Sequence, residues 1–134
     1  MVYRYAYLVR QRRGADCAEL FASDAVYEIR EISPLSSGEF RLRNRLTGAG
    51  EIGDFVARSA GGAVRIFPII HNLTVEIDGD RAVGDCLMTS RSFPGGGEVF
   101  GSYQDSFVRR TGRWLFSSRI YTIYSAPWIE EAVR

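Results

Sequence analysis

Four long segments in the second half of the chain alternate apolar and polar residues, and they constrain the fold more than any other feature. Glycine-containing turns separate these segments, which span residues 64–77, 81–92, 98–109 and 113–124. Alternation with a period of two is typical of β-strands, and short turns join antiparallel neighbours. The sequence therefore predicts an antiparallel meander of four strands.

Two segments within the first 60 residues carry helical periodicity instead. Apolar side chains recur at helical spacing over residues 2–9 and again over 50–60, which predicts a helix in each segment. Between these segments, Asp16 and Glu19 have the spacing of a capping box. A short second helix is therefore expected to begin at Asp16.

Two further extended segments are expected before the meander. Ser23 and Asp24 have turn chemistry and precede a predicted strand over 25–32, while residues 39–43 form either a short strand or an extended lid. Helices that precede a long curved sheet predict an α+β fold. We expect a single domain over residues 1–134, a cone-shaped α+β barrel whose N-terminal helices close the curved antiparallel sheet around a pocket for a small molecule.

The charge balance limits the classes of partner. All 17 basic residues are arginine and 16 residues are acidic, so no global field favours nucleic acid or an anionic membrane. Cys17 and Cys86 lie far apart without a CxxC motif, and no apolar run approaches the ~20 residues of a membrane span. We expect a soluble cytoplasmic protein. No motif has metal-ligand or phosphate-cradle spacing, so no metal and no cofactor are predicted.

Several segments resemble a known family. Residues 21–28, 72–80, 103–105 and 112–114 look like the recurrent segments of the SnoaL-like branch of the nuclear transport factor two superfamily. That superfamily includes ketosteroid isomerase, scytalone dehydratase, polyketide cyclases and the small subunits of ring-hydroxylating dioxygenases. The resemblance implies the cone-shaped fold, a hydrophobic small-molecule ligand and a homodimer.

Ketosteroid isomerase is the first relative whose site can be compared. The resemblance places Tyr5 at the tyrosine that binds the oxyanion and Asp105 at the second oxyanion-hole residue, a protonated acid. It places Ile29 at the aspartate that acts as general base, and an isoleucine cannot accept a proton. From the residues alone, Tyr5 is either a ligand donor or a core aromatic. Asp105 is either a pocket acid or the partner of an arginine.

The dehydratases are the second relatives that can be compared. Arg10 and Pro68 stand where these relatives have an aspartate and a histidine. Arg10 either binds a carboxylate or is a solvated arginine at a helix end. Strand alternation points His71, the only histidine, away from the face of Pro68. The same parity groups His71 with an apolar set of core or dimer-surface residues, namely Ile69, Leu73, Val75 and Ile77. Asn72 matches a residue that faces the cavity in relatives.

The candidate site follows from these comparisons and from the aromatic strands. Tyr27, Tyr103 and Tyr121 either line a pocket or pack in the core. The catalytic candidates are Tyr5, Asp105 and His71, and the substrate-binding candidates are Arg10, Tyr27, Ile29, Asn72, Tyr103 and Tyr121. We expect a cofactor-independent lyase, isomerase or cyclase that acts on a hydrophobic, oxygenated, polycyclic or polyketide-like molecule. The alternatives are a non-catalytic binding or assembly module, such as a dioxygenase small-subunit-like protein, and cyclisation by cavity shape alone.

Overall fold

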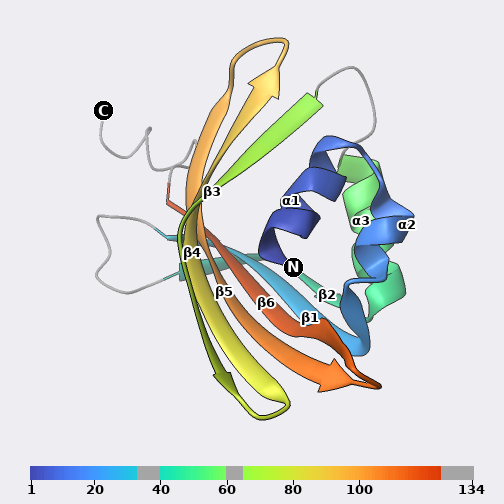
Figure 1. Cartoon of the computed structure of the whole chain (residues 1–134). Helices are drawn as coiled ribbons and strands as arrows, with labels where there is room; N and C mark the ends of the chain where they lie inside the picture. The colour runs from blue at the N-terminus through green and yellow to red at the C-terminus, as the bar shows by residue number, and fades with distance from the viewer. Residues whose placement is uncertain (33–39, 60–64, 125–134) are drawn as a thin grey trace.

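Three helices cover the concave face of a six-stranded sheet in the described residues of the computed structural model, which are 1–32, 40–59 and 65–124 (Figure 1). The helices are α1 (Val2–Arg10), α2 (Gly14–Ala18) and α3 (Ala49–Ser59). The strands are β1 (Phe21–Ile32), β2 (Phe40–Thr47), β3 (Arg65–Asp78), β4 (Arg81–Phe93), β5 (Glu98–Arg110) and β6 (Arg113–Ile123). Residues 39, 60 and 64, at the ends of three predicted elements, lie outside the described residues.

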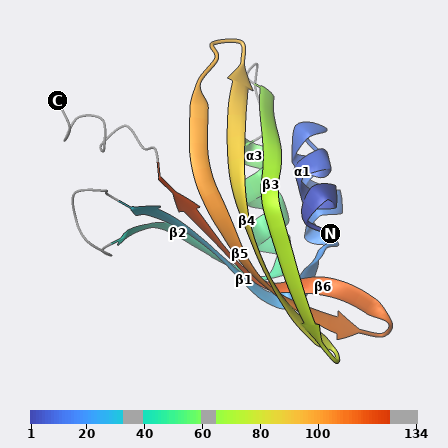
Figure 2. The ribbon, with the colours of Figure 1, turned by 60° about the vertical axis from the view of Figure 1, so that its left-hand side comes forward.

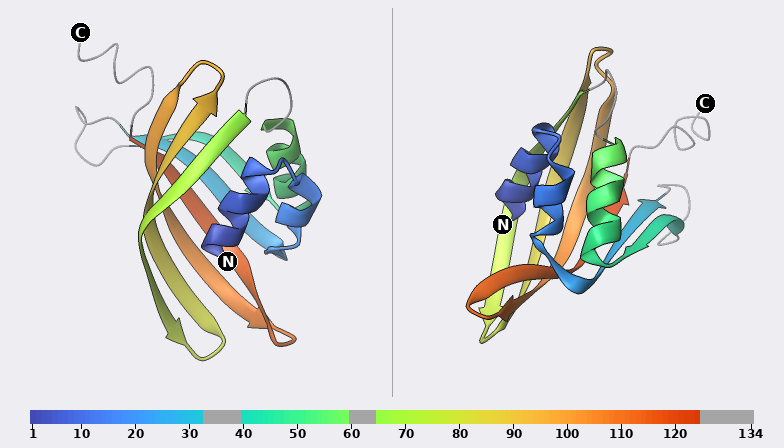
Figure 3. Two further views of the ribbon diagram at one scale, coloured as in Figure 1. Left: turned by 45° about the horizontal axis from the view of Figure 1, so that its top comes forward. Right: turned by 90° about the vertical axis from the view of Figure 1, so that its right-hand side faces the viewer.

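The sheet has the order β2-β1-β6-β5-β4-β3. The strands β3 to β6 form the predicted antiparallel meander, and β1 joins it by pairing in parallel with β6. Figure 2 shows how strongly the sheet twists and curves between its two edge strands, β2 and β3. The predicted α+β layout is confirmed, although the sheet remains open. The helices close its concave side, with α1 against β3 and α3 against β1 and β2 (Figure 3).

The short helix α2 begins at Gly14 rather than at Asp16, so the predicted capping box is wrong. Asp16 lies in the first turn, where its carboxylate accepts a 2.6 Å hydrogen bond from Arg13. The earlier start follows from tight packing between α2 and α3. A Cβ at Gly14 would lie 2.7 Å from the carbonyl oxygen of Gly53, so only glycine allows this approach.

The strand β1 also begins earlier than predicted, at Phe21. Its pairing with β6 shifts register between Phe21 and Val26, and this irregularity contains Ser23 and Asp24. These residues therefore bend the strand instead of preceding it. Asp24 forms an exposed ion pair with Arg110 at 3.2 Å.

A β-bulge in β3 reverses the strand parity. The pairing with β4 shifts between His71 and Thr74, and Asn72 has a φ of +52°. Before the bulge, Pro68 lies on the concave face and His71 on the convex face. After it, the concave face carries Leu73, Val75 and Ile77, which lie near Phe107 and Trp114. The predicted common face of His71 and these apolar residues is therefore wrong, because the extra residue inverts the alternation.

A second bulge, at Ser117 in β6, determines what the core contains. Phe107 pairs with Phe116, but Ser106 pairs with Ser118, so Ser117 has no opposite residue in β5. Phe116 and Arg119 consequently both point to the concave side, where both are fully buried.

No helix in the described part of the chain is long and apolar enough to cross a membrane.

Candidate functional site

A cavity of about 500 Å³ lies between the concave face of the sheet and the helices α1 and α3. Apolar side chains from both layers form most of its wall, including Val9, Phe55, Ile66, Met88 and Val99. Its volume falls within the ~300–1,000 Å³ typical of small-molecule sites. The predicted pocket is therefore present, and helical and strand residues share its lining.

Four tyrosines bring hydroxyl groups to this apolar cavity, namely Tyr5, Tyr27, Tyr103 and Tyr121. Burial raises the pKa of Tyr5, while the charge of Arg119 and a hydrogen bond from Tyr27 act in the opposite direction. Burial also raises the pKa of Tyr27 and of Tyr103 well above the usual value, and that of Tyr121 to about 12. All four hydroxyls are protonated at neutral pH, so they can donate hydrogen bonds but cannot act as bases.

The lining contributed by the described residues contains no carboxylate and no imidazole, and Arg43 is its one charged side chain. Neither tyrosine hydroxyls nor a guanidinium can accept a proton at neutral pH. The described residues also include no group of three or more His, Cys, Asp or Glu side chains that could hold a metal ion. The cavity is therefore equipped to bind an oxygenated ligand through donors.

A buried ion pair lies behind the tyrosines. Arg119 Nε is 2.7 Å from Asp105 Oδ1 and Arg119 Nη2 is 3.1 Å from Oδ2, and both side chains are fully buried. The guanidinium carbon lies 3.6 Å from the ring centroid of Tyr103 and 4.5 Å from that of Tyr5. This bidentate geometry is the strongest arrangement of an arginine with a carboxylate, and the aromatic faces add cation–π attraction.

The ion pair shifts the pKa of each partner. Burial acts to lower the pKa of Arg119, but the charge and hydrogen bonds of Asp105 together with Tyr103 and Tyr27 outweigh it, so the pKa is raised and the guanidinium stays charged. Burial raises the pKa of Asp105, and Arg119 acts against that shift. Arg119 Nη1 is buried and has no hydrogen-bond partner among the described residues.

Of the two roles left open for Asp105, the structure shows the ion pair with an arginine. Its carboxylate is the partner of an arginine, and Asp105 is not among the residues that line the cavity. Tyr5, Tyr27, Ile29, Tyr103 and Tyr121 do line the cavity, as expected of ligand-binding residues.

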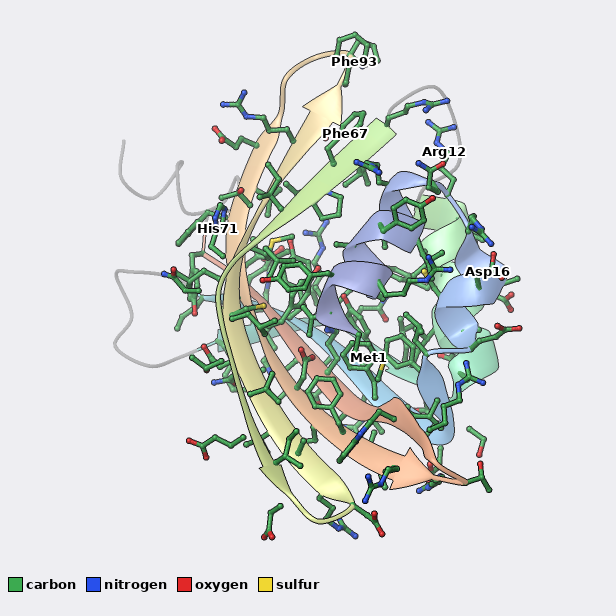
Figure 4. The ribbon with its side chains drawn as sticks, in the orientation of Figure 1. Met1, Arg12, Asp16, Phe67, His71 and Phe93 are labelled. Atoms are coloured by element: carbon green, nitrogen blue, oxygen red, sulfur yellow. The ribbon has the colours of Figure 1, made fainter. Side chains whose placement is uncertain are left out.

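Three predicted site residues lie elsewhere. Arg10 is exposed and stacks over the ring of Tyr7 at 5.3 Å, outside the cavity. His71 is exposed on the convex face, where its Nε2 lies 3.0 Å from Thr89 Oγ1 (Figure 4). Asn72 is exposed at the β3 bulge and does not line the cavity. The structure thus separates all three from the tyrosines.

Sequence reasoning missed three charged residues of this region, namely Arg119, Arg43 and Glu31. A signal for Arg119 was present, since Asp105 and an arginine on the next strand could pair across the hairpin. The signal for Glu31 was weaker: strand alternation places Glu31 on the same face of the strand as Tyr27 and Ile29. Its side chain is only 4% exposed, and both Arg41 and Arg43 form ion pairs with it.

Comparisons with known proteins agree with the fold. The chain resembles three solved structures from Novosphingobium aromaticivorans. The first is the β subunit of a candidate aromatic-ring-hydroxylating dioxygenase, with a TM-score of 0.76 and 16% identity over 92% of this chain and 84% of that chain. The second is a candidate scytalone dehydratase, with a TM-score of 0.72 and 16% identity over 92% and 79% of the two chains. The third is an NTF2-like protein with a cystatin-like fold, with a TM-score of 0.71 and 17% identity over 99% and 84%.

Identities this low establish the fold alone, and no curated protein matches the sequence. The family assignment rests on a different comparison. The family model of the SnoaL-like domain matches residues 1–120. This match covers most of the chain and includes the three helices, β1 to β5 and most of β6. The chain belongs to the SnoaL-like domain family.

Proposed function

We propose that the protein is a cofactor-independent lyase, isomerase or cyclase that acts on a hydrophobic, oxygenated small molecule in the cavity. The observation that supports this most directly is the apolar cavity of about 500 Å³ with four protonated tyrosine hydroxyls in its wall. Apolar surface would select a hydrophobic ligand, and the hydroxyls would orient its oxygen atoms. We further propose that the protein is cytoplasmic and forms a homodimer. Light scattering at micromolar concentration would test the dimer.

In this proposal Tyr5 is the main catalytic residue and Tyr27 supports it. A hydrogen bond between their side chains acts to lower the pKa of Tyr5 and to raise that of Tyr27. The Tyr5 hydroxyl would donate to a carbonyl or hydroxyl oxygen of the ligand and stabilise negative charge that develops there. Burial raises the pKa of Tyr5, and the positive charge of Arg119 behind the ring opposes that rise, which makes the hydroxyl a better donor than burial alone would leave it.

The proton acceptor must come from the substrate or from water, because the described lining offers none. This restricts the chemistry to steps in which a donor and a fixed geometry suffice, such as ring closure, or loss of a leaving group that a tyrosine hydroxyl stabilises by a hydrogen bond while water or the substrate takes up the released proton. Holding a ligand in a reactive conformation can itself lower a barrier by several kcal/mol, up to ~7–11 kcal/mol in well-oriented cases.

The test is a panel of hydrophobic ketones, polyketones and hydroxylated polycyclic compounds, with products detected by mass spectrometry. Tyr5→Phe should lower kcat for any converted compound by about 10²–10³-fold, the usual effect of losing one oxyanion donor. Tyr7→Phe is the matched control, because Tyr7 lies on the same helix but is 40% exposed and packs on Arg10 outside the cavity. Equal rates for the two variants would contradict the role of Tyr5.

A non-catalytic binding or assembly module is the second candidate. Two observations favour it: the described lining has no proton acceptor, and the fold is similar to that of a candidate dioxygenase β subunit. This candidate predicts that the panel yields binding without turnover. It also predicts that the protein co-purifies from its native host with an iron-containing partner.

A further inference from the structure

Arg43 owes its position to a β-bulge in β2. Ile29 pairs with Asn44, whereas Arg30 pairs with Leu42, so Arg43 is the extra residue. In a regular strand, consecutive side chains point to opposite faces. Here both Arg43 and Asn44 line the cavity, because the bulge turns the arginine inward.

Glu31 and two arginines form a charged cluster at this end of the cavity. Glu31 is 4% exposed and forms ion pairs with Arg41 and with Arg43, the latter at 3.1 Å. One carboxylate therefore faces two guanidinium groups. The side chain of Arg43 is 57% exposed, so only part of its five N–H donors is committed to Glu31.

The surroundings of Arg43 suit an anionic group attached to an apolar body. Burial raises the pKa of Tyr121 to about 12 and the charge of Arg43 opposes that shift, so the guanidinium acts on a hydroxyl of the same cavity. Beyond this hydroxyl the wall is apolar, with Ile29, Ile123 and Val99. The described lining contains no carboxylate, and Glu31 lies outside it.

We propose that Arg43 anchors the carboxylate of an amphipathic ligand whose apolar body fills the cavity. The inference rests on the proposed small-molecule function and names the substrate class for that site. Arg43 is then a residue that determines specificity. When it turns from Glu31 to the ligand, Arg41 remains paired with Glu31, so no buried carboxylate is left uncompensated.

Direct binding of a matched pair of probes tests this proposal without any assay of turnover. Naphthalene carboxylate and the neutral naphthalene carboxamide have nearly the same shape and differ in charge. The purified full chain should bind the carboxylate about tenfold more tightly at neutral pH and low salt, as followed by probe fluorescence or calorimetry. Arg43→Met should remove this preference and leave the affinity for the carboxamide within about twofold.

Two further variants distinguish a specific anchor from a general charge effect. Arg45→Met is the matched control, because Arg45 lies on the same strand, is 56% exposed and pairs with Glu28, but does not line the cavity. It should retain the preference. Glu31→Gln should raise the affinity for the carboxylate, because it releases Arg43, and structural damage would not produce such a gain.

The proposal is overturned if the wild-type protein binds neither probe or binds both equally. It is also overturned if Arg43→Met keeps the preference, if Arg45→Met loses it as fully, or if Glu31→Gln fails to raise the affinity. Failure of the proposed enzymatic function gives a different pattern. A protein that converts no compound in the panel but shows the preference that depends on Arg43 would refute the activity and support the anchor.

Discussion

Replacing Asp105 by asparagine removes the counter-ion of a fully buried guanidinium. The amide oxygen of the substituted side chain could accept one hydrogen bond from Arg119, but the charge would remain in the core without a partner carboxylate. Breaking a buried ion pair on one side costs ~3–5 kcal/mol, out of a total stability of ~5–15 kcal/mol for a domain. With the usual entropy of unfolding per residue and 134 residues, this loss corresponds to a decrease in Tm of about 11–18 °C.

Urea unfolding at neutral pH, followed by circular dichroism and tryptophan fluorescence, measures this loss. The control is Asp80→Asn, because Asp80 is 70% exposed in its 2.8 Å ion pair with Arg109. A surface pair of this kind contributes ~0–1 kcal/mol. The double variant Asp105→Leu/Arg119→Met should recover most of the stability, since apolar replacement of a buried pair is often neutral or stabilising.

The double variant also defines the result that would refute the reasoning. If the decreases in the free energy of unfolding caused by the two single substitutions add up in the double variant, the two side chains do not act as a pair. A loss below about 1 kcal/mol for Asp105→Asn would mean that water or a rearranged core satisfies the guanidinium.

Two further predictions concern helix packing and pH. Gly14→Ala should destabilise the protein by ~1–3 kcal/mol, because its Cβ would lie 2.7 Å from the Gly53 carbonyl oxygen. Gly50→Ala, with nothing within 4 Å of the new Cβ, should be neutral or stabilising by up to ~1 kcal/mol in the same urea assay. Burial raises the pKa of Cys17 from 9.0 to about 11. The stability that its protonated thiol contributes is complete below pH 9 and should be lost as pH rises towards 11, so urea midpoints should fall over this range and fall less in Cys17→Ala.

The tyrosine lining of the cavity could be predicted from the sequence because it depends on local periodicity. Tyr5 lies on the buried stripe of α1, and strand alternation places Tyr27 and Ile29 on one face of β1. Strand alternation also predicted that His71 points away from the face of Pro68, and the structure agrees. The grouping of His71 with Leu73 was wrong, since alternation was extended across a bulge that leaves no clear mark in the residues.

The sequence by itself determined the helices, the long strands and the apolar faces that enclose the cavity, because periodicity and turn residues act within a few positions of the chain. Only the tertiary structure decided which charged groups lie in the interior. With regular pairing from the β5–β6 turn, Asp105 would face Ser118 and Arg119 would point outward, but the extra residue Ser117 brings Arg119 opposite Asp105. The bulge at Arg43 acts in the same way at the other edge of the site. A register shift of one residue exchanges the two faces of a strand, and that shift is determined by packing against the partner strand and the helices.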